Sequence, residues 1–523
     1  MKTRWKILLG FCVVAAVVAI AAIARHYQLK MAVARYCAEL KAKGEPMDLA
    51  QVIPPPVPLE KNAAPLITNA LLQIYLETNY TNSIIFKNPP FGMNQEIPGK
   101  EMIGWRQTVI HVPGNYYPTN TWNDLSEELV VRKDNLDDFR KLIENPIIDF
   151  NYDYSDSKNF IPVLAPHLSQ FKIAMQWLAT LEFYNLHQNN VTNACADVRT
   201  MLAFVKGETD ERFEISQLVR FALAQISADA TWNILQTTNV SDEELAQLQQ
   251  DWQSLKFIAP LKNAFLFEQI SDLKLTDDIR QSPTNLDNQI GWTASVVMKT
   301  ENGTYGKNSF IQKIKNEIST KWGNFQWRWF WSYSDEVRGL KMWRIVLDGT
   351  QMMETNHSFQ STESFLNANF STLGFDSVKH NPYFIISQNA HGQLIAIKRS
   401  ARVETIRNMT VTAIALKRYQ ILHNQFPATL NELIPNFLES VPIDYMDGKL
   451  LRYRKKADGT FLLYSVGENE KDDDGDPSYK PENGVTYSGY SWQNPHALDW
   501  VWPQPATGAE IQKYYDERGK KSD

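Results

Sequence analysis

The sequence predicts a mostly helical protein, built as helical hairpins or a bundle, with one N-terminal transmembrane helix and a small C-terminal α+β domain. Three observations predict this class. The run Ile7–Ala24 carries no charge, apolar residues between 168 and 255 recur at helical spacings, and two strand-like runs meet at Asp458-Gly459. The chain has 523 residues, which is enough for several domains, because single cores stop growing near roughly 250–300 residues.

The composition favours a folded chain with no general affinity for nucleic acids. Hydrophobic residues make up 43% and charged residues 21% of the chain, and the formal net charge is -6. A nucleic-acid binder needs clustered Lys and Arg to displace phosphate counterions. Three cysteines, Cys12, Cys37 and Cys195, are too few for a disulfide scaffold. A Cys37–Cys195 bridge is allowed in an oxidising compartment, but no spacing argument supports it.

The N-terminal run has the length and flanks of a membrane anchor. Its 18 residues make roughly 27 Å of helix, close to the hydrocarbon thickness of a bilayer. Ala22–Ala24 resembles a signal-peptidase site, but signal-peptide cores are shorter, about 7–15 residues. We therefore expect an uncleaved signal anchor in a bacterial inner membrane, with a single pass and the C-terminal part in the periplasm. Three basic residues precede the run: Lys2, Arg4 and Lys6.

Composition divides the chain into four segments. Residues 1–30 form the anchor, and residues 31–160 form a helical and irregular region that contains the proline-rich linker Pro54–Pro58. Residues 161–399 form a helical domain. Residues 400–523 form the α+β domain.

Apolar spacing in the helical domain predicts four consecutive helices. The first contains Leu168 to Leu178, and the second runs from Thr192 to Lys206 with Gly207 as its C-cap. The third spans Phe213–Leu235, and the fourth opens with a Ser241/Glu244 capping box. Four residues are expected to form the buried face of the third helix: Ile215, Val219, Ala222 and Ile226.

Helical hairpins of this kind are similar to tetratricopeptide-type solenoids, which bind peptides. No sequence period repeats, however, so a bundle that packs only for stability is the alternative. A dense aromatic run between Lys321 and Leu347 is expected to pack in the core, although such rings also stack on ligands or lie at membrane interfaces.

The C-terminal segment has an ordered series of signals. A helix over Val403–Leu422 leads to Asn424-Gln425-Phe426-Pro427, and a short helix starts at Thr429. A hairpin around Asp458-Gly459 follows, and then Tyr464–Asn469 precedes the acidic loop Asp472–Asp476. This segment resembles the globular part of the major pseudopilins of type II secretion. The resemblance implies that the loop wraps a calcium ion.

Two departures limit that resemblance. Pseudopilins join their membrane helix directly to the globular domain, whereas here the helical domain intervenes, and an early Glu in the apolar run is missing. Polymerisation into a pseudopilus is therefore not expected. The whole layout is similar to planctomycete and verrucomicrobial envelope proteins of no assigned activity, which implies location and architecture only.

The acidic loop also predicts a cation site on physical grounds. Four aspartates lie within five positions and repel one another unless solvent or a cation screens them, and Ca²⁺ prefers oxygen ligands. The loop does not have EF-hand spacing, because no Glu stands at the twelfth place. The alternative is a solvated acidic loop. The expected calcium ligands are Asp472, Asp473 and Asp476, with Asn469 as a weaker one.

No catalytic motif is found in the sequence: it has no phosphate-binding loop, no His-Glu-x-x-His, no Cys-x-x-Cys and no Gly-x-Ser-x-Gly. His167 and His187 are expected to be surface or capped polar groups. Asp149, Asp153 and Asp156 are a weak candidate acid/base cluster for sugar chemistry. We therefore expect no catalytic residues, and a membrane-anchored binding or scaffolding protein whose partner is an envelope protein or peptide. The alternative is an envelope hydrolase with a site assembled from distant residues.

Overall fold

The structure, a computed structural model, is mostly helical, as predicted. Helices account for 72% of the described residues, and a three-stranded sheet lies near the C-terminus. The described residues are 2–80, 84–85, 105–106, 122–152, 154, 166–281, 325–374, 390–478 and 496–504.

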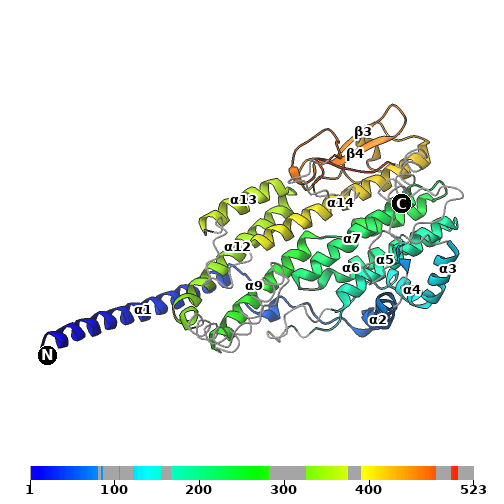
Figure 1. Cartoon of the computed structure of the whole chain (residues 1–523). Coiled ribbons are helices and arrows are strands. Elements are labelled where there is room, and N and C mark those ends of the chain that lie inside the picture. Colours follow the sequence, from blue (N-terminus) through cyan, green and yellow to red (C-terminus); the bar gives the residue numbers. More distant parts are fainter. Residues whose placement is uncertain are drawn as a thin grey trace, which may run out of the picture.

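The first helix, α1 (Lys2–Ala42), projects from the body as a rod (Figure 1). No proline interrupts it, and it ends before Gly44, whose φ of +82° is left-handed, as is common for a residue that stops a helix. The second half of α1 packs against α12 (Ser332–Asn356), where Val33 and Leu40 are buried. The stretch beyond the predicted anchor is thus one continuous helix joined to the body.

Short elements connect α1 to the central helices. They are η1 (Leu49–Gln51), η2 (Leu59–Lys61), α2 (Ala64–Tyr80), the antiparallel pair β1 (Ile84–Ile85) and β2 (Trp105–Arg106), α3 (Trp122–Val131), α4 (Lys133–Arg140) and η3 (Lys141–Ile143).

The central helices confirm the four predicted ones and add a fifth. They are α5 (Pro166–His187), α6 (Val191–Gly207), α7 (Glu214–Leu235), α8 (Asp242–Ser254) and α9 (Ile258–Gln281), with the short η5 (Glu208–Asp210) after α6. α5, α6 and α7 pack against one another. The predicted capping box is present: the Glu244 amide donates to Ser241 Oγ (3.2 Å), and the Ser241 amide donates to Glu244 Oε2 (3.0 Å).

The predicted buried face of α7 is only partly right: Val219 and Ile226 are half-buried and pack against the core. Ile215 is 39% exposed and Ala222 is also exposed, whereas Ser216, Gln217 and Arg220 are buried. α7 packs against α5, α6, α9 and α14 (Ala390–His423), so apolar residues are needed on more than one side. The side that faces the end of α6 holds a buried polar cluster instead.

Gly207 does not act as the predicted left-handed C-cap. Its φ of -60° is helical, and it is the last residue of α6. A Cβ at this position would lie 2.5 Å from Ile148 Cδ1 and 2.8 Å from the Pro146 carbonyl oxygen. The glycine is thus needed for the close approach of segment 146–148 to the end of α6.

The C-terminal elements follow the predicted order. After α13 (Phe359–Thr372) and α14 come η8 (Leu430–Leu433), β3 (Arg452–Lys455), β4 (Phe461–Ser465), η9 (Gly467–Asn469) and β5 (Trp500–Val501). β3 and β4 pair antiparallel with Arg452 opposite Tyr464, and the turn contains Gly459 at φ +85°. β5 pairs with the other edge of β4 and was not predicted.

The predicted boundary between residues 399 and 400 lies inside α14. This helix packs against α7 and α8, and one hydrophobic cluster extends from Ala63 to Trp502. Polar contacts cross the same interface: Arg418 Nε lies 2.8 Å from Asp242 Oδ1, and Gln249 Nε2 donates to the Phe437 carbonyl at 2.6 Å. We call the part from η8 to β5 the hairpin module and the helices α2 to α14 the helical body. The hairpin module and the helical body therefore share a core.

The aromatic run divides into a buried and an exposed part. Trp327 and Trp343 are buried, as expected, but Phe325, Trp329 and Phe330 are 46%, 52% and 42% exposed. Core packing was thus the wrong expectation for these three, which lie in or beside the short π-helical turn η6 (Trp327–Trp331) next to α1. Trp322 falls outside the described residues. The three cysteines are free, so Cys37 and Cys195 form no bridge.

Candidate functional site: an acidic loop and a buried His-Glu-Glu cluster

The acidic loop follows η9 at the end of the hairpin, and most of its side chains have protein partners. Asn469 Nδ2 donates to Asp473 Oδ2 at 2.8 Å. Asp472 Oδ1 accepts from the Tyr464 hydroxyl at 3.0 Å, while its other oxygen lies 3.5 Å from Arg452 Nε. The Arg454 guanidinium lies 2.7 Å from Asp474 Oδ1. Arginines thus compensate part of the charge for which the sequence suggested a metal.

The backbone of the acidic loop is held by Asp499, a residue that the sequence analysis did not single out. This fully buried carboxylate accepts from the amides of Gly475 (2.7 Å), Asp476 (3.2 Å) and Asp473 (3.5 Å). Burial raises the pKa of Asp499, and the three amide bonds oppose that rise. The loop backbone is therefore folded around an anion.

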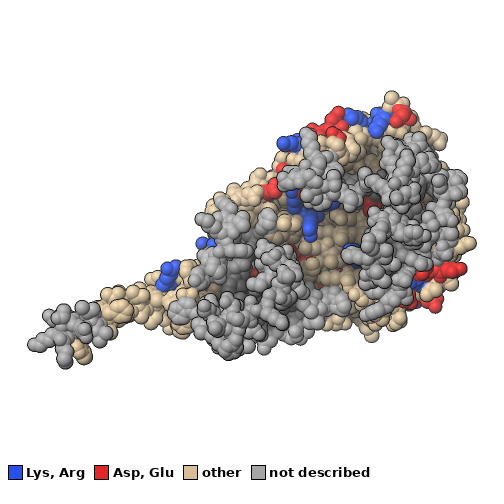
Figure 2. Space-filling model, viewed as in Figure 1, with Lys and Arg blue, Asp and Glu red and all other residues tan. Residues whose placement is uncertain are grey.

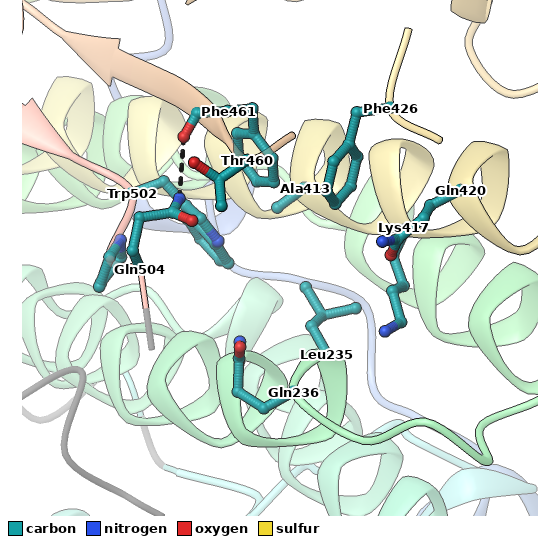
Figure 3. A pocket seen from close by; sticks show the side chains of 11 residues that line it. Leu235, Gln236, Ala413, Lys417, Gln420, Phe426, Thr460, Phe461, Trp502 and Gln504 are labelled. Carbon is teal, nitrogen blue, oxygen red and sulfur yellow. Dashed lines mark hydrogen bonds between the residues drawn. The ribbon is translucent and has the colours of Figure 1, made fainter. Parts of the chain in front are cut away.

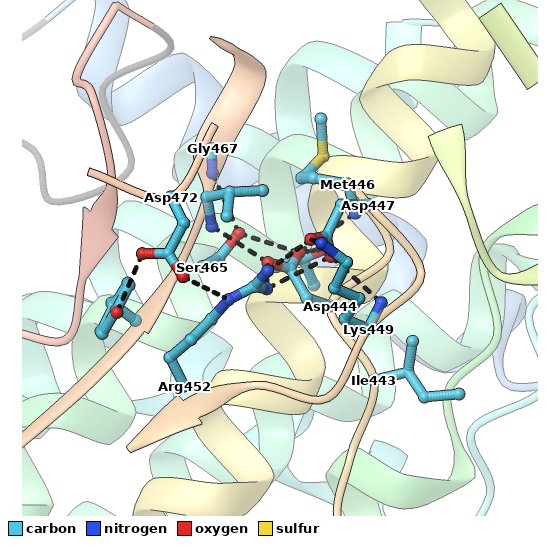
Figure 4. A network of polar contacts seen from close by, with 12 residues as sticks. Ile443, Asp444, Met446, Asp447, Lys449, Arg452, Ser465, Gly467 and Asp472 are labelled. Atoms are coloured by element: carbon cyan, nitrogen blue, oxygen red, sulfur yellow. Dashed lines mark hydrogen bonds and ion pairs between the residues drawn. The ribbon is translucent and has the colours of Figure 1, made fainter. Parts of the chain in front are cut away.

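A second buried aspartate anchors the base of the hairpin (Figure 4). Asp444 accepts from the Val466 amide (3.0 Å) and Ser465 Oγ (2.9 Å), and Arg452 Nη1 lies 2.8 Å from its Oδ2. Arg452 also pairs with Asp447, so one guanidinium joins both aspartates to Asp472. This network fixes β3 and β4 against the preceding loop.

Of the four predicted calcium ligands, the structure pairs only Asn469 with Asp473. Asp472 faces Arg452 and Tyr464, and Asp476 Oδ1 accepts from the Ser478 amide at 2.9 Å. Calcium at this loop stays a prediction.

The described His, Cys, Asp and Glu side chains do form one group of three with ligand atoms within 4.8 Å of one another. It consists of His167, Glu208 and Glu211. His167 Nε2 lies 3.2 Å from Glu211 Oε2 and 4.0 Å from Glu208 Oε2. The exposed fractions are 3% for His167, 1% for Glu208 and 9% for Glu211. We call this group the His-Glu-Glu cluster.

Two segments supply the three side chains of the cluster, and α7 supports one of them. His167 is on the first turn of α5, and Glu208 and Glu211 are in the connection between α6 and α7. Gln217 Nε2, from α7, donates to the carbonyls of Glu208 (3.2 Å) and Glu211 (2.8 Å) in that connection. Arg220, one turn further on, donates to the Val205 carbonyl at 2.6 Å. The buried polar face of α7 therefore holds the cluster's backbone.

The outer contacts of the cluster orient its side chains. Tyr152 Oη lies 2.6 Å from His167 Nδ1, and Ser216 Oγ donates to Glu211 Oε1 at 2.9 Å. Among the described residues no donor group reaches the buried Glu208 Oε2, and its nearest acidic neighbour is the Glu211 carboxyl. Burial, together with the adjacent Glu211 carboxylate, raises the pKa of Glu208 well above its ordinary value.

His167 does not lie at the surface, one of the two expected places: its side chain is buried, and both ring nitrogens have polar partners, Tyr152 and Glu211. His187 is partly exposed at the end of α5. Asp149 accepts from the amides of Val57 (3.3 Å) and Asn151 (2.8 Å), so it holds the proline-rich linker. Asp153 and Asp156 fall outside the described residues.

A third feature is a pocket of about 210 Å³ where the hairpin meets the helical body (Figure 3). The Lys417 amine, on α14, points into it, and burial lowers the pKa of this lysine. None of the described residues that line the pocket is a carboxylate or a histidine. Its lining residues are Leu235, Gln236, Ala413, Lys417, Gln420, Phe426, Thr460, Phe461, Trp502, Pro503 and Gln504.

No protein-family profile, no curated protein and no solved structure matches this chain.

Proposed function

We propose that the chain is a single-pass protein of a bacterial inner membrane, anchored by α1, whose periplasmic body binds or scaffolds an envelope protein or peptide. The observation that carries the proposal is the outer part of α1. This helix contains the only candidate membrane span among the described residues, with a mean hydropathy of 2.1 and none of that window buried. In Figure 2 the described part of the rod is tan, and basic side chains appear nearer the body.

The outer part of α1 would expose a large apolar surface to water. Its large apolar side chains are more than half exposed, and no other described element covers them: Leu9, Phe11, Val13, Val14, Val17, Val18, Ile20 and Ile23. Contiguous apolar surface of this size marks an interaction site with protein or lipid. A length near the bilayer thickness selects lipid.

Exposed aromatic rings lie at the base of the rod, on α1 itself and in or beside η6. We call Tyr27, Phe325, Trp329 and Phe330 the aromatic collar. His26 Nδ1 donates to the Trp329 carbonyl at 2.9 Å, and the two rings are 5.4 Å apart. His26 is two residues beyond Ala24, about 3 Å along the helix axis. Tryptophan and tyrosine concentrate at membrane–water interfaces, so the collar would lie at headgroup level.

The pocket beside Lys417 supports a binding role for the body. Among the described residues no acidic side chain pairs with Lys417, and burial makes its unpaired charge costly. An anionic or carbonyl group from a partner would relieve this cost. The C-terminal end of α14, beside the pocket, lies at the end of the body opposite α1 (Figure 1). The pocket is therefore far from the proposed membrane.

Calcium at the acidic loop belongs to the same proposal as a stabilising ion of the hairpin module. Asp473 and Asp476 are the side chains best placed to serve it, because arginines already pair with Asp472 and Asp474. We expect weak binding, since both carboxylates also have partners within the protein.

The alternative, an envelope hydrolase, is favoured by one observation, the convergence of His167, Glu208 and Glu211. The three side chains are buried, and neither the Lys417 pocket nor the two smaller described pockets include them. Without a described path for substrate, binding remains the better-supported function.

Membrane fractionation of the full chain tests the anchor. Replacing Val17 and Val18 with Asp places two charges in the proposed span, each costing about 2.5–3.5 kcal/mol at a helix centre. We expect this variant to leave the membrane fraction after carbonate washing. The control replaces Val130 and Val131, which are each 69% exposed on α3, with Asp, and it should stay membrane-bound. Equal retention of both variants would refute the anchor.

Protease added to spheroplasts tests the orientation. A periplasmic body is digested without lysis of the inner membrane, whereas a body that is digested only after lysis would place it in the cytoplasm and contradict the proposal.

A further inference from the structure

We propose that the His-Glu-Glu cluster is a binding site for one divalent transition-metal ion, held by His167 Nε2, Glu208 Oε2 and Glu211 Oε2. The site is independent of the proposed membrane-anchored binding function, and it would join the start of α5 to the connection between α6 and α7.

The spacing of the donor atoms fits such an ion. Zinc binds histidine nitrogen and carboxylate oxygen at about 2.0–2.2 Å, so ligand atoms around a tetrahedral ion are about 3.4 Å apart. His167 Nε2 is 3.2 Å from Glu211 Oε2 and 4.0 Å from Glu208 Oε2. All three donor atoms lie within 4.8 Å of one another, so an inward movement of Glu208 would bring them to three vertices of a tetrahedron.

Glu208 is the second, independent indication of a ligand. Its side chain is 1% exposed and its Oε2 has no hydrogen-bond donor among the described residues. A buried carboxylate oxygen without a partner is costly. The charge of Arg220 acts favourably on Glu208, but its Nε and Nη1 donate to Val205 and Gln217, and no ion pair joins it to Glu208 among the described contacts.

The contacts around the donors resemble those that tune metal ligands. A metal-binding histidine usually passes its second ring N–H to a hydrogen-bond acceptor, which fixes the ring and its tautomer. Tyr152 Oη is 2.6 Å from His167 Nδ1 and serves as that acceptor. Ser216 Oγ donates to the Glu211 oxygen that faces away from the site, which leaves Oε2 for the metal.

The donor set selects the class of ion. Ca²⁺ and Mg²⁺ take oxygen ligands, whereas imidazole together with carboxylates suits Zn²⁺ and neighbouring divalent metals. The competing explanation is a shared proton between Glu208 and Glu211, which would neutralise the pair without any ion. The two explanations differ in how the protein responds to zinc.

Zinc titration of the full-length protein in detergent, after removal of metals with a chelator, distinguishes them. We expect uptake of one Zn²⁺ per chain and a higher melting temperature. Tyr152→Phe removes only the acceptor for His167 and should weaken zinc affinity by about 10- to 100-fold, without loss of the fold.

The difference in melting temperature between Glu208→Gln and the wild type should change sign when zinc is added. A glutamate with only a structural role would give no such change. In chelator the Glu208→Gln variant should melt at a higher temperature than the wild type, because a neutral amide costs less to bury beside the Glu211 carboxylate than an ionisable carboxyl group does. In zinc it should melt at a lower temperature, because a ligand is lost. The matched control is Glu182→Gln, another fully buried glutamate with an unpartnered oxygen but no histidine beside it. This control should bind zinc as the wild type does.

Two results would overturn the proposal. One is a folded wild type that takes up no zinc at micromolar concentration. The other is zinc uptake that is equal in the wild type, Glu208→Gln and Tyr152→Phe, which would place the ion elsewhere. If Glu208→Gln does not fold, Tyr152→Phe alone decides between these outcomes and the expected weakening.

Discussion

The acidic loop and the His-Glu-Glu cluster are opposite ways of arranging carboxylates. The loop has its aspartates side by side in sequence, yet they point to different partners: Asp472 to Arg452, Asp474 to Arg454 and Asp473 to Asn469. The cluster draws its residues from separate segments, yet its donor atoms converge within 4.8 Å. The loop is largely exposed, and most of its carboxylates have partners. The cluster is buried, and Glu208 Oε2 has no donor among the described residues.

The two regions therefore differ in what their carboxylates need from their surroundings. Exposed charges are screened by water and salt, so their repulsion needs no metal. A buried carboxylate has no such relief, and its unpaired oxygen has to be neutralised by a proton or a cation. Burial without a partner therefore indicates a ligand better than a run of aspartates does.

The largest effect is expected from removing the buried aspartate of the hairpin module. Asp444→Ala leaves the Val466 amide, Ser465 Oγ and Arg452 without their acceptor. Breaking a buried pair in this way costs about 3–5 kcal/mol. Asp472→Ala is the comparison, because Asp472 is 51% exposed, and pairs of that kind contribute at most about 1 kcal/mol. Denaturant unfolding of both variants measures the difference, and equal losses would contradict the contrast between buried and exposed carboxylates.

Gly207→Ala should have the next largest effect. Its new Cβ would lie 2.8 Å from the Pro146 carbonyl oxygen. This oxygen belongs to the backbone, so the clash cannot be relieved by the rotation of a side chain. Overpacking of this kind costs about 1–3 kcal/mol, and the shift of the adjacent Glu208 should also weaken zinc binding. Gly10→Ala on the rod, where nothing lies within 4 Å, should change neither the melting temperature nor zinc affinity. An unchanged Gly207→Ala protein would show that segment 146–148 moves freely.

Two half-buried carboxylates on α9, Glu268 and Asp272, should contribute more to the pH dependence of stability than the exposed aspartates of the loop. Burial raises the pKa of Asp272 to about 7 and that of Glu268 to about 8. Because the folded pKa lies above the unfolded one, their stabilising contribution is complete below the unfolded pKa and is lost as pH rises through the folded pKa. The melting temperature should therefore fall between about pH 5 and pH 8.

Asp272→Asn should flatten that fall. Asp474→Asn is the control, because this side chain is 80% exposed and should leave the slope unchanged. A steeper fall in Asp272→Asn than in the wild type would contradict the assignment.

Calcium at the acidic loop should have the smallest effect. Its aspartates keep arginine, asparagine and amide partners when no ion is bound, so little free energy is left for calcium to add. We expect millimolar calcium to raise the melting temperature only slightly, and Asp473→Asn to abolish even this rise. A large shift at micromolar calcium would show that the loop, and not the buried cluster, is the main ion site.

Local signals predicted much of the fold. The uncharged run, the Ser241/Glu244 capping box and the Asp458-Gly459 turn each depend on neighbours within a few residues, and each predicted element is present. Features that depend on distant partners were not predictable in this way. The strand β5 joins β4 through Trp500, and Asp499 reaches back to the loop amides.

The candidate cluster was missed for the same reason. His167 and Glu211 are 44 positions apart, and no spacing rule connects them. One signal was present in the sequence: Ser216, Gln217 and Arg220 lie at helical spacing on one side of α7, opposite the apolar side that was expected to be buried. A polar stripe on a central helix indicates a buried polar partner, and here that partner is the connection that carries Glu208 and Glu211.

Differential scanning fluorimetry of the full-length protein, freed of metals and then given either zinc or calcium, compares the two regions in one experiment. The arrangement of carboxylates described above predicts a clear rise in melting temperature with zinc, lost in Glu208→Gln, and almost no rise with calcium. A rise with calcium that Asp473→Asn removes, together with no response to zinc, would contradict it.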